Sequence, residues 1–169
     1  MKVVIYMAIS SDGFIAREDG STDFVSDAEW INYSKFVNDA GNIIIGRKTY
    51  EIMKKNKEFD KFGDIFVVVV SSQDIKTTEK NHLFVKSSKE ALEFLEKKNF
   101  NVAVVSGGGK LNTSFIKEDL VNEIILDVEP EILGKGIKLF DNIEPKLKLI
   151  NKKKFGNNEF QCRYKVLKD

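Results

Sequence analysis

The chain has 169 residues, with 27 Lys or Arg residues against 26 Asp or Glu residues. This balance excludes the strongly basic class of proteins that bind nucleic acid or an anionic membrane through overall charge, and we expect neither partner. Cys162 and His82 are the single cysteine and the single histidine, which excludes an intrachain disulfide framework and a structural zinc site of about four such ligands. We therefore expect no metal. The first apolar run ends at Ser10, too early for a membrane span or a cleaved leader, and we expect a cytoplasmic protein.

The first half of the chain alternates short apolar runs with helical patterns. In the helical pattern of residues 27–40, the i, i+3, i+4 spacing predicts an apolar face on Trp30, Ile31, Ser34 and Val37 or Asn38. Residues 65–70 hold Ile, Phe and four Val without polar alternation, which is typical of a strand covered on both faces. The expected strands are residues 3–9, 42–45 and 65–70, and the expected helices are residues 27–40 and 48–57.

The second half repeats this alternation and then ends in a hairpin. Strands are expected over residues 82–85, 102–105 and 123–128, and helices over residues 88–98 and 111–117. Two runs, residues 147–153 and 160–166, flank Gly156 and predict an antiparallel hairpin. The alternation through residue 128 predicts an α/β fold with a mostly parallel sheet and helices on both faces. No linker or repeat divides the pattern, so we expect a single domain over residues 1–169.

One strand runs directly into a helix through three glycines. Gly107, Gly108, Gly109 and Lys110 follow the strand expected at residues 102–105. Glycine lets a phosphate approach the backbone, and the first N–H groups of the helix then point toward it. The spacing matches neither the Rossmann fingerprint nor the P-loop. The sequence predicts a pyrophosphate-binding loop, and the alternative is a tight turn that only needs small residues.

A second loop, Gly46-Arg47-Lys48-Thr49, has the same layout. Cations near a helix start oppose the helix dipole by roughly 0.3–1 kcal/mol each, and a bound anion would remove this conflict. Arg also suits phosphate through its forked donors. We expect phosphate binding here too, against the alternative of solvated basic residues.

Two serines, Ser71 and Ser72, follow the most apolar strand. In open α/β sheets ligands bind beyond the carboxyl ends of the strands, where all three loops are expected. The two hydroxyls predict contacts to a ribose phosphate, and an ordinary loop is the alternative.

Asp27 begins the first expected helix. Ser26 and Glu29 fit a capping box around it, which would make Asp27 only a favourable first-turn acid. The functional interpretation is a partly buried acid that orients or protonates a substrate nitrogen. Asp12 and Asp23, in the preceding loop, are the rival acids.

Several stretches, taken in chain order, resemble the dihydrofolate reductase superfamily over nearly the whole chain. They are residues 8–16, 26–30, 45–51, 70–73, 85–88 and 105–110. Residues 11–16 and 128–140 are more similar to the riboflavin-biosynthesis reductase branch, the RibD C-terminal domain. The deaminase often fused to that branch is not encoded here, because its zinc-binding motifs are missing.

The resemblance implies a dihydrofolate reductase-like fold, with a central, mostly parallel eight-stranded sheet, helices on both faces, and NADPH as hydride donor. By motif, the loop at Gly46–Thr49 would hold the cofactor phosphates from one side, and Gly107–Leu111 would cover the pyrophosphate. Ser71 and Ser72 would meet the adenosine 2′-phosphate, with Lys86 and Ser87 nearby.

The nicotinamide and substrate sites follow from the same resemblance. Ala8 and Ile15 would line the nicotinamide site, and the loop to Phe24 would close it. Asp27 falls where dihydrofolate reductases keep their substrate-binding acid, and Trp30 and Ile31 follow it in the same helix. Phe24, Trp30 and Ile31 are therefore the expected substrate contacts.

The leading interpretation is an NADPH-dependent reductase acting on a pyrimidine- or pterin-type small molecule, closest to 5-amino-6-(5-phosphoribosylamino)uracil reductase. Its substrate would need a second phosphate site, for which Arg17 is the candidate. Dihydrofolate reductase activity, or reduction of another small molecule, is the alternative; residues 58–65 lack the arginine that holds the folate tail. A nucleotide-binding module without catalysis is the alternative from another class. The resemblance also suggests a homodimer through the C-terminal strands.

Overall fold

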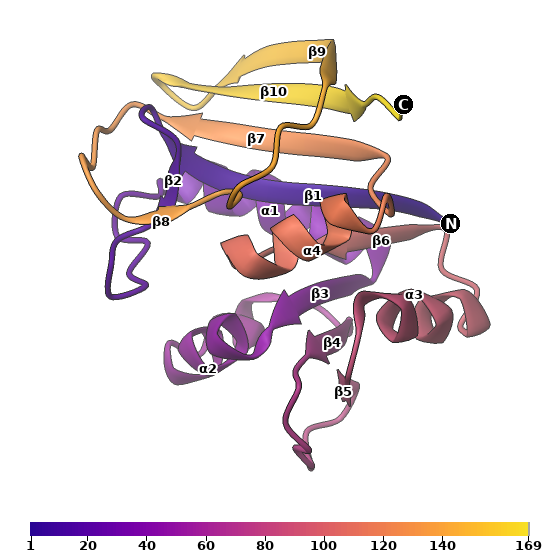
Figure 1. Ribbon diagram of the computed structural model, residues 1–169. Helices are drawn as coiled ribbons and strands as arrows, with labels where there is room; N and C mark the ends of the chain where they lie inside the picture. The colour runs from indigo at the N-terminus through magenta and orange to yellow at the C-terminus, as the bar shows by residue number, and fades with distance from the viewer. Residues whose placement is uncertain (169) are drawn as a thin grey trace.

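The computed structural model describes residues 1–168 and is built around an eight-stranded sheet of order β5-β4-β3-β6-β1-β7-β10-β9 (Figure 1). Its strands are β1 (Lys2–Ser10), β3 (Asn42–Gly46), β4 (Phe66–Val70), β5 (His82–Val85), β6 (Val102–Val105), β7 (Glu123–Glu129), β9 (Leu147–Phe155) and β10 (Glu159–Val166). Every strand pair from β5 to β7 is parallel, and β10 is antiparallel to β7 and β9. The mostly parallel sheet and the antiparallel terminal hairpin are both confirmed.

Helices cover both faces of the sheet, as the alternation predicted. They are α1 (Asp27–Ala40), α2 (Arg47–Lys55), the short 3-10 helix η1 (Glu58–Lys61), α3 (Ser88–Lys97) and α4 (Gly109–Lys117). One buried cluster packs α1 and α2 on the sheet through Tyr33 and Met53, and the other packs α3 and α4 through Leu95 and Phe115. Figure 1 shows α1 behind β1 and α4 in front of it.

The central strands lack polar alternation because helices cover both of their faces. Ile43, Ile44 and Ile45 of β3 alternate between the two buried clusters, and each has no exposed surface. Burying such side chains stabilises the fold by about 1.5–3 kcal/mol apiece. The core therefore fixes β3 in the middle of the sheet, with its carboxyl end at Gly46 held between the ends of β4 and β6.

The parallel strands all end at one edge of the sheet. The register pairs Gly46 with Val70, Val70 with Val85, and Ser10 with Glu129. The loops that follow β1, β3, β4, β5, β6 and β7 consequently emerge together at this carboxyl edge.

A two-stranded sheet of β2 (Phe14–Ala16) and β8 (Ile137–Lys138) was not predicted from the sequence. It ties the loop after β1 to residues 130–141, which we call the strap. The Asp12 carboxylate accepts hydrogen bonds from the backbone N–H groups of Leu133 and Gly134 at 3.1 and 2.7 Å. A side-chain carbon at Gly136 would lie 2.3 Å from the carbonyl oxygen of Ala16, so only glycine fits there.

The predicted apolar face of α1 is wrong in part. Ile31 is 66% exposed and Asn38 is exposed, whereas Glu29, Tyr33 and Val37 are buried. The packed face is rotated because the first turn places Glu29 against β7 rather than presenting an apolar residue to the sheet. The helices also begin slightly earlier than expected, at Arg47 and Gly109.

Candidate functional site

The two glycine-led loops lie against each other at the carboxyl edge. The backbone N–H of Gly46 donates a 2.8 Å hydrogen bond to the carbonyl oxygen of Gly107. A side-chain carbon added at Gly108 would lie 3.6 Å from Oγ1 of Thr49, so the loops also meet beyond that bond. The structure therefore brings together two predicted phosphate-binding loops that lie far apart in the sequence.

Each loop opens a helix that has no capping side chain. Gly46 is the N-cap of α2 and Gly108 is the N-cap of α4, and neither provides a side-chain hydrogen bond to its helix. The N–H groups at the start of a helix carry the positive end of its dipole and form a ready arrangement for an anion. Two such starts held side by side are suited to the two phosphates of a dinucleotide.

Basic side chains surround these helix starts. The first turn of α2 has no acidic residue and carries Arg47 and Lys48. The Arg47 guanidinium pairs with Glu51 at 2.6 Å one turn later. Lys48 and Lys110 are exposed, and within residues 1–168 neither forms an ion pair. Their charges remain available to an anionic ligand.

The serine loop lies beside the second helix start through the pairing of Gly46 with Val70. Ser71 is buried, and its hydroxyl accepts from the backbone N–H of Gln73 at 3.1 Å, while Ser72 is exposed. Lys86 donates to the Ser72 carbonyl oxygen at 3.2 Å and also pairs with Asp74. Lys86 is thus near the serines, as expected.

Ser87 has a local role. It is the N-cap of α3, where its hydroxyl accepts from the Glu90 backbone N–H at 3.2 Å. Leu111 is 8% exposed and belongs to the hydrophobic core under α4. Of the residues expected to meet the cofactor, these two have side chains already engaged within the fold.

Ile15 lies next to the glycine triplet, and Ala8 lies at the end of β1. A side-chain carbon at Gly107 would meet Met7 Cε at 3.1 Å and Ile15 Cδ1 at 4.0 Å. Ala8 pairs with Asp127 of β7. Ile15 therefore lies against the glycine triplet, and Ala8 lies beside Asp127 of β7.

The three residues expected to contact the substrate lie in different environments in the structure. Phe24 is 7% exposed and lies in the closing loop. Trp30 is half-buried and packs against Tyr33 and Phe62, with ring centroids 5.6 and 5.5 Å away. Ile31 points away from the core and is largely exposed. The structure does not gather these three residues into one packed wall.

Asp27 is exposed, which does not fit the expectation of a partly buried acid. It occupies the first position of α1, after the N-cap Ser26, whose hydroxyl accepts from the Glu29 backbone N–H at 3.1 Å. The second half of the expected capping box is wrong. The Ser26 N–H and hydroxyl both donate to Glu129 Oε1 at 3.0 Å instead of to Glu29.

A buried group of acids beside Ala8 was not predicted from the sequence. Glu29, Asp127 and Glu129 are 3%, 0% and 1% exposed. The Asp127 carboxylate accepts from the Tyr6 hydroxyl and from the Gln161 amide, both at 2.7 Å. These three acids and their two donors form what we call the acid cluster.

Glu29 differs from the other two acids because its carboxyl group has no hydrogen bond within residues 1–168. Burial raises the pKa of Glu29 well above its ordinary value of 4.5, and the nearby Asp127 and Glu129 raise it further. Burial also raises the pKa of Asp127. The protonated form of Glu29 is therefore favoured, and in that form its carboxyl group can both donate and accept a hydrogen bond.

A sequence signal for these acids exists in β7. Glu123, Asp127 and Glu129 have odd numbers and share one face of a strand that is otherwise apolar. Acids at that spacing in a covered strand indicate a polar function on the buried face. The capping pattern accounts for Glu29 locally and gives no indication that its side chain is buried.

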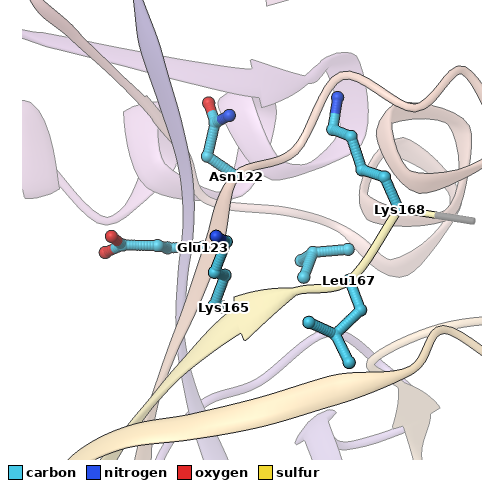
Figure 2. A pocket seen from close by; sticks show the side chains of 6 residues that line it. Asn122, Glu123, Lys165, Leu167 and Lys168 are labelled. Atoms are coloured by element: carbon cyan, nitrogen blue, oxygen red, sulfur yellow. The ribbon is translucent and has the colours of Figure 1, made fainter.

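A cavity lies at the other edge of the sheet (Figure 2). It has a volume of about 580 Å³ and is lined by residues at the start of β7 and the end of β10. In Figure 2 the Glu123 carboxylate points away from Leu167 and Lys168. Its walls contain none of the expected site residues. Residues 1–168 contain no group of three His, Cys, Asp or Glu side chains that could hold a metal ion, and no helix among them could span a membrane.

Comparison with protein families decides the assignment of the chain. The model of the RibD C-terminal domain family matches residues 1–159. The chain belongs to this family. The uncharacterized protein YwjB of Bacillus subtilis (strain 168) is 34% identical over 162 residues, which cover 92% of each chain. YyaP of the same organism, also uncharacterized, is 26% identical over 176 residues, covering 96% of this chain and 94% of YyaP.

Solved structures of the RibD type have the same fold. A putative riboflavin biosynthesis protein from Shewanella sp. PV-4 superposes with a TM-score of 0.79 at 22% identity, covering 99% of this chain and 100% of that one. The Thermotoga maritima diaminohydroxyphosphoribosylaminopyrimidine deaminase/5-amino-6-(5-phosphoribosylamino)uracil reductase superposes with a TM-score of 0.75 at 18% identity. That match covers 98% of this chain and 56% of the Thermotoga chain. The dihydrofolate reductase-like fold expected from the sequence is confirmed.

Proposed function

We propose that this RibD C-terminal domain is an NADPH-dependent reductase that transfers hydride to a pyrimidine- or pterin-type small molecule. The observation that carries the proposal is the contact between two uncapped helix starts, joined by the hydrogen bond from Gly46 to Gly107. The named activity closest to this proposal is that of the Thermotoga maritima relative, a 5-amino-6-(5-phosphoribosylamino)uracil reductase.

The residues present fit a dinucleotide. Side-chain carbons at Gly46 and Gly108 would enter the gap between the loops, at 3.8 Å from the Gly107 carbonyl oxygen and 3.6 Å from Thr49 Oγ1. The two helix starts would hold the pyrophosphate, with Arg47 and Lys48 at one of them. Ser71, Ser72 and Lys86 would hold the 2′-phosphate. When bound, NADPH supplies a hydride.

Reduction of a C=N or C=O bond also consumes a proton, and the acid cluster can hold it. Glu29 has a raised pKa and lies in the first turn of α1, and its carboxyl group forms no hydrogen bond within residues 1–168. Tyr6 and Gln161 fix Asp127 beside it, so the negative charge that would remain on Glu29 after proton donation is disfavoured. Because its pKa is raised, Glu29 favours the protonated form from which a proton can pass to a substrate nitrogen or oxygen, which is the role expected of Asp27.

The test is NADPH oxidation, followed optically, with a panel of pyrimidine and pterin substrates. Wild-type protein should turn over at least one of them. Glu29→Gln should lower kcat by about 10²-fold or more, within the usual range for loss of a general acid, while NADPH affinity stays unchanged. Asp27→Asn is the matched variant in the same helical turn.

The outcomes separate the candidates. Loss of turnover in Asp27→Asn alone would return the role to the exposed acid. Tight NADPH binding without turnover of any panel member would instead favour a nucleotide-binding module. Turnover of dihydrofolate above all other substrates would favour dihydrofolate reductase activity.

A further inference from the structure

Charge is divided unevenly between the two sides of the carboxyl edge. The side that we assign to the cofactor consists of residues 46–49, 71–72, 86 and 107–110, and its charged residues are all basic. The side next to it, which we call the substrate side, consists of residues 10–31 and 127–136. The substrate side has nine acidic and two basic residues.

The two segments of the substrate side form one unit. The Ser11 backbone N–H donates to the Glu131 carbonyl oxygen at 2.7 Å, and Ser26 bonds to Glu129 through both its N–H and its hydroxyl. The Asp12 carboxylate holds the strap through two backbone N–H groups. The acids of both segments are therefore gathered around one edge of β1 and β7.

Both basic residues of the substrate side are already paired with acids. Arg17 Nε lies 2.5 Å from Asp23 Oδ1, and Lys135 Nζ lies 2.8 Å from Glu18 Oε2. Glu131 and Asp19 also act on the Arg17 guanidinium, and together with Asp23 they raise the pKa of that group. Arg17, the expected second phosphate site, is thus neutralised within its own loop.

Exposed acids that form no direct ion pair also lie on this side, although Asp19 and Glu131 act on Arg17 from a distance. Asp19, Asp27 and Glu131 are exposed, and within residues 1–168 none of them forms an ion pair. Beneath them lie the three buried acids of the acid cluster. A phosphate monoester carries a charge of about −1.5 to −2 at pH 7 and would meet this negative field. Like charges brought together in a binding site cost several kcal/mol and serve to reject the wrong partner.

The N–H groups of a heterocycle would be attracted, not repelled, by these acids. Carboxylates accept hydrogen bonds from such groups, and the buried Glu29 carboxyl group can accept them as well. A ring with amino or amide N–H groups would supply the Glu29 carboxyl group with the hydrogen bonds that it lacks within residues 1–168.

We propose that the substrate side takes a heterocycle that carries N–H groups and no phosphate, neutral or cationic, and that it rejects the phosphate ester of the same compound. This inference rests on the proposed reductase function. It departs from the phosphorylated substrate named for the Thermotoga relative. The cofactor side alone is built for phosphate.

The experiment compares two pairs of compounds that differ only by a phosphate: 5-amino-6-ribosylaminouracil with its 5′-phosphate, and cytidine with its 5′-monophosphate. Calorimetry on the NADP⁺-loaded protein gives the dissociation constants, and NADPH oxidation gives kcat/KM for the first pair. In each pair the phosphate-free compound should bind at least about tenfold more tightly, and the ratio should shrink as salt is raised. Tighter binding of either phosphate ester would overturn the proposal, and so would absence of binding by all four compounds.

A charge-neutralising variant tests the cause. Asp19→Asn combined with Glu131→Gln should reduce the discrimination against phosphate by about threefold or more, because it removes two exposed charges. Asp60→Asn combined with Glu93→Gln, both exposed and in η1 and α3, makes the same charge change elsewhere and should leave the ratio unaltered. Equal effects of the two double variants would contradict a local origin.

Failure of the inference is distinguishable from failure of the proposed function. A prior NADPH titration tests the cofactor side alone. If NADPH does not bind, the reductase function fails. If NADPH binds and the phosphate esters are preferred, only the inference about the substrate side fails.

Discussion

The backbone N–H of Gly46 donates a 2.8 Å hydrogen bond to the carbonyl oxygen of Gly107, across a gap of about sixty residues in the chain. This bond fixes the starts of α2 and α4 relative to each other. Because both starts lack capping side chains, the pair presents free N–H groups to a ligand in the gap between the loops. The following predictions test what this surface and the acid cluster do.

Gly46→Ala should weaken NADPH binding without unfolding the protein. Gly46 has φ −79°, and the added carbon would lie 3.8 Å from the nearest atom, so the fold can accept it. The free energy of unfolding should stay within about 1 kcal/mol of wild type, while the dissociation constant for NADPH rises by about tenfold or more.

Gly63→Ala is the control for that variant. The carbon added there would lie 3.5 Å from Asn38 Oδ1, an ordinary contact away from the loops. Denaturant unfolding and calorimetry measure both quantities. Equal NADPH affinity in Gly46→Ala and Gly63→Ala would exclude the gap between the loops as the cofactor site.

Lys48→Ala should move stability and affinity in opposite directions. Lys48 lies in the first turn of α2, where a cation opposes the helix dipole, so its removal should stabilise the protein by roughly 0.3–1 kcal/mol. NADPH should bind more weakly because a phosphate loses a charged partner. Lys117→Ala, in the last turn of α4, should destabilise slightly and leave affinity unchanged. A loss of stability in Lys48→Ala would contradict this account.

Glu29→Gln should change how stability depends on pH. The pKa of Glu29 is raised in the folded state above its unfolded value of 4.5. Between these two values the folded state binds more protons than the unfolded state, so the Glu29 contribution to stability falls as pH rises. The variant lacks this contribution. Its free energy of unfolding should therefore rise relative to that of wild type as pH increases from 4.5 toward neutrality. Parallel curves over that range would show that Glu29 ionises normally.

The C-terminal hairpin should mediate self-association, and we propose a homodimer through it. Strand β9 is the last strand of the sheet, and Leu147, Leu149 and Phe160 of the hairpin are 37%, 48% and 45% exposed. An edge strand has unpaired backbone groups, and the exposed apolar side chains of this hairpin could pack against a second copy. Leu149→Glu should shift the mass measured by sedimentation equilibrium toward monomer. Ile132→Glu replaces a side chain that is 77% exposed, on the strap, and should have no effect. A wild-type protein that remains monomeric at high concentration would refute the dimer.

The strand-to-helix placement of the glycine-led loops was largely predictable from the sequence, and the buried acids were not. A glycine directly between a strand and a helix has few structural roles, so residues 46–49 and 107–110 could be recognised one loop at a time. Their contact depends on the order of β3 and β6 in the sheet, which local patterns do not specify. Ser71 and Lys86 lie close together because β4 pairs with β5, and local patterns do not specify that pairing either.

Glu29 and Asp27 illustrate the limit of local reasoning. Both acids fit the same capping pattern, and only the rotation of α1 on the sheet decides which one is buried. The strap and the β2–β8 sheet escaped prediction because they are held by long-range contacts, such as Asp12 with Gly134. Contacts of that kind leave no periodic signal in the chain.

The most direct test of the central claim is calorimetric titration of the wild-type protein with NADPH and with NADH. If the two glycine-led loops form one dinucleotide site, NADPH should bind with one site per chain, and NADH, which lacks the 2′-phosphate expected at Ser71, Ser72 and Lys86, should bind more weakly. Absence of binding by either nucleotide would contradict the account.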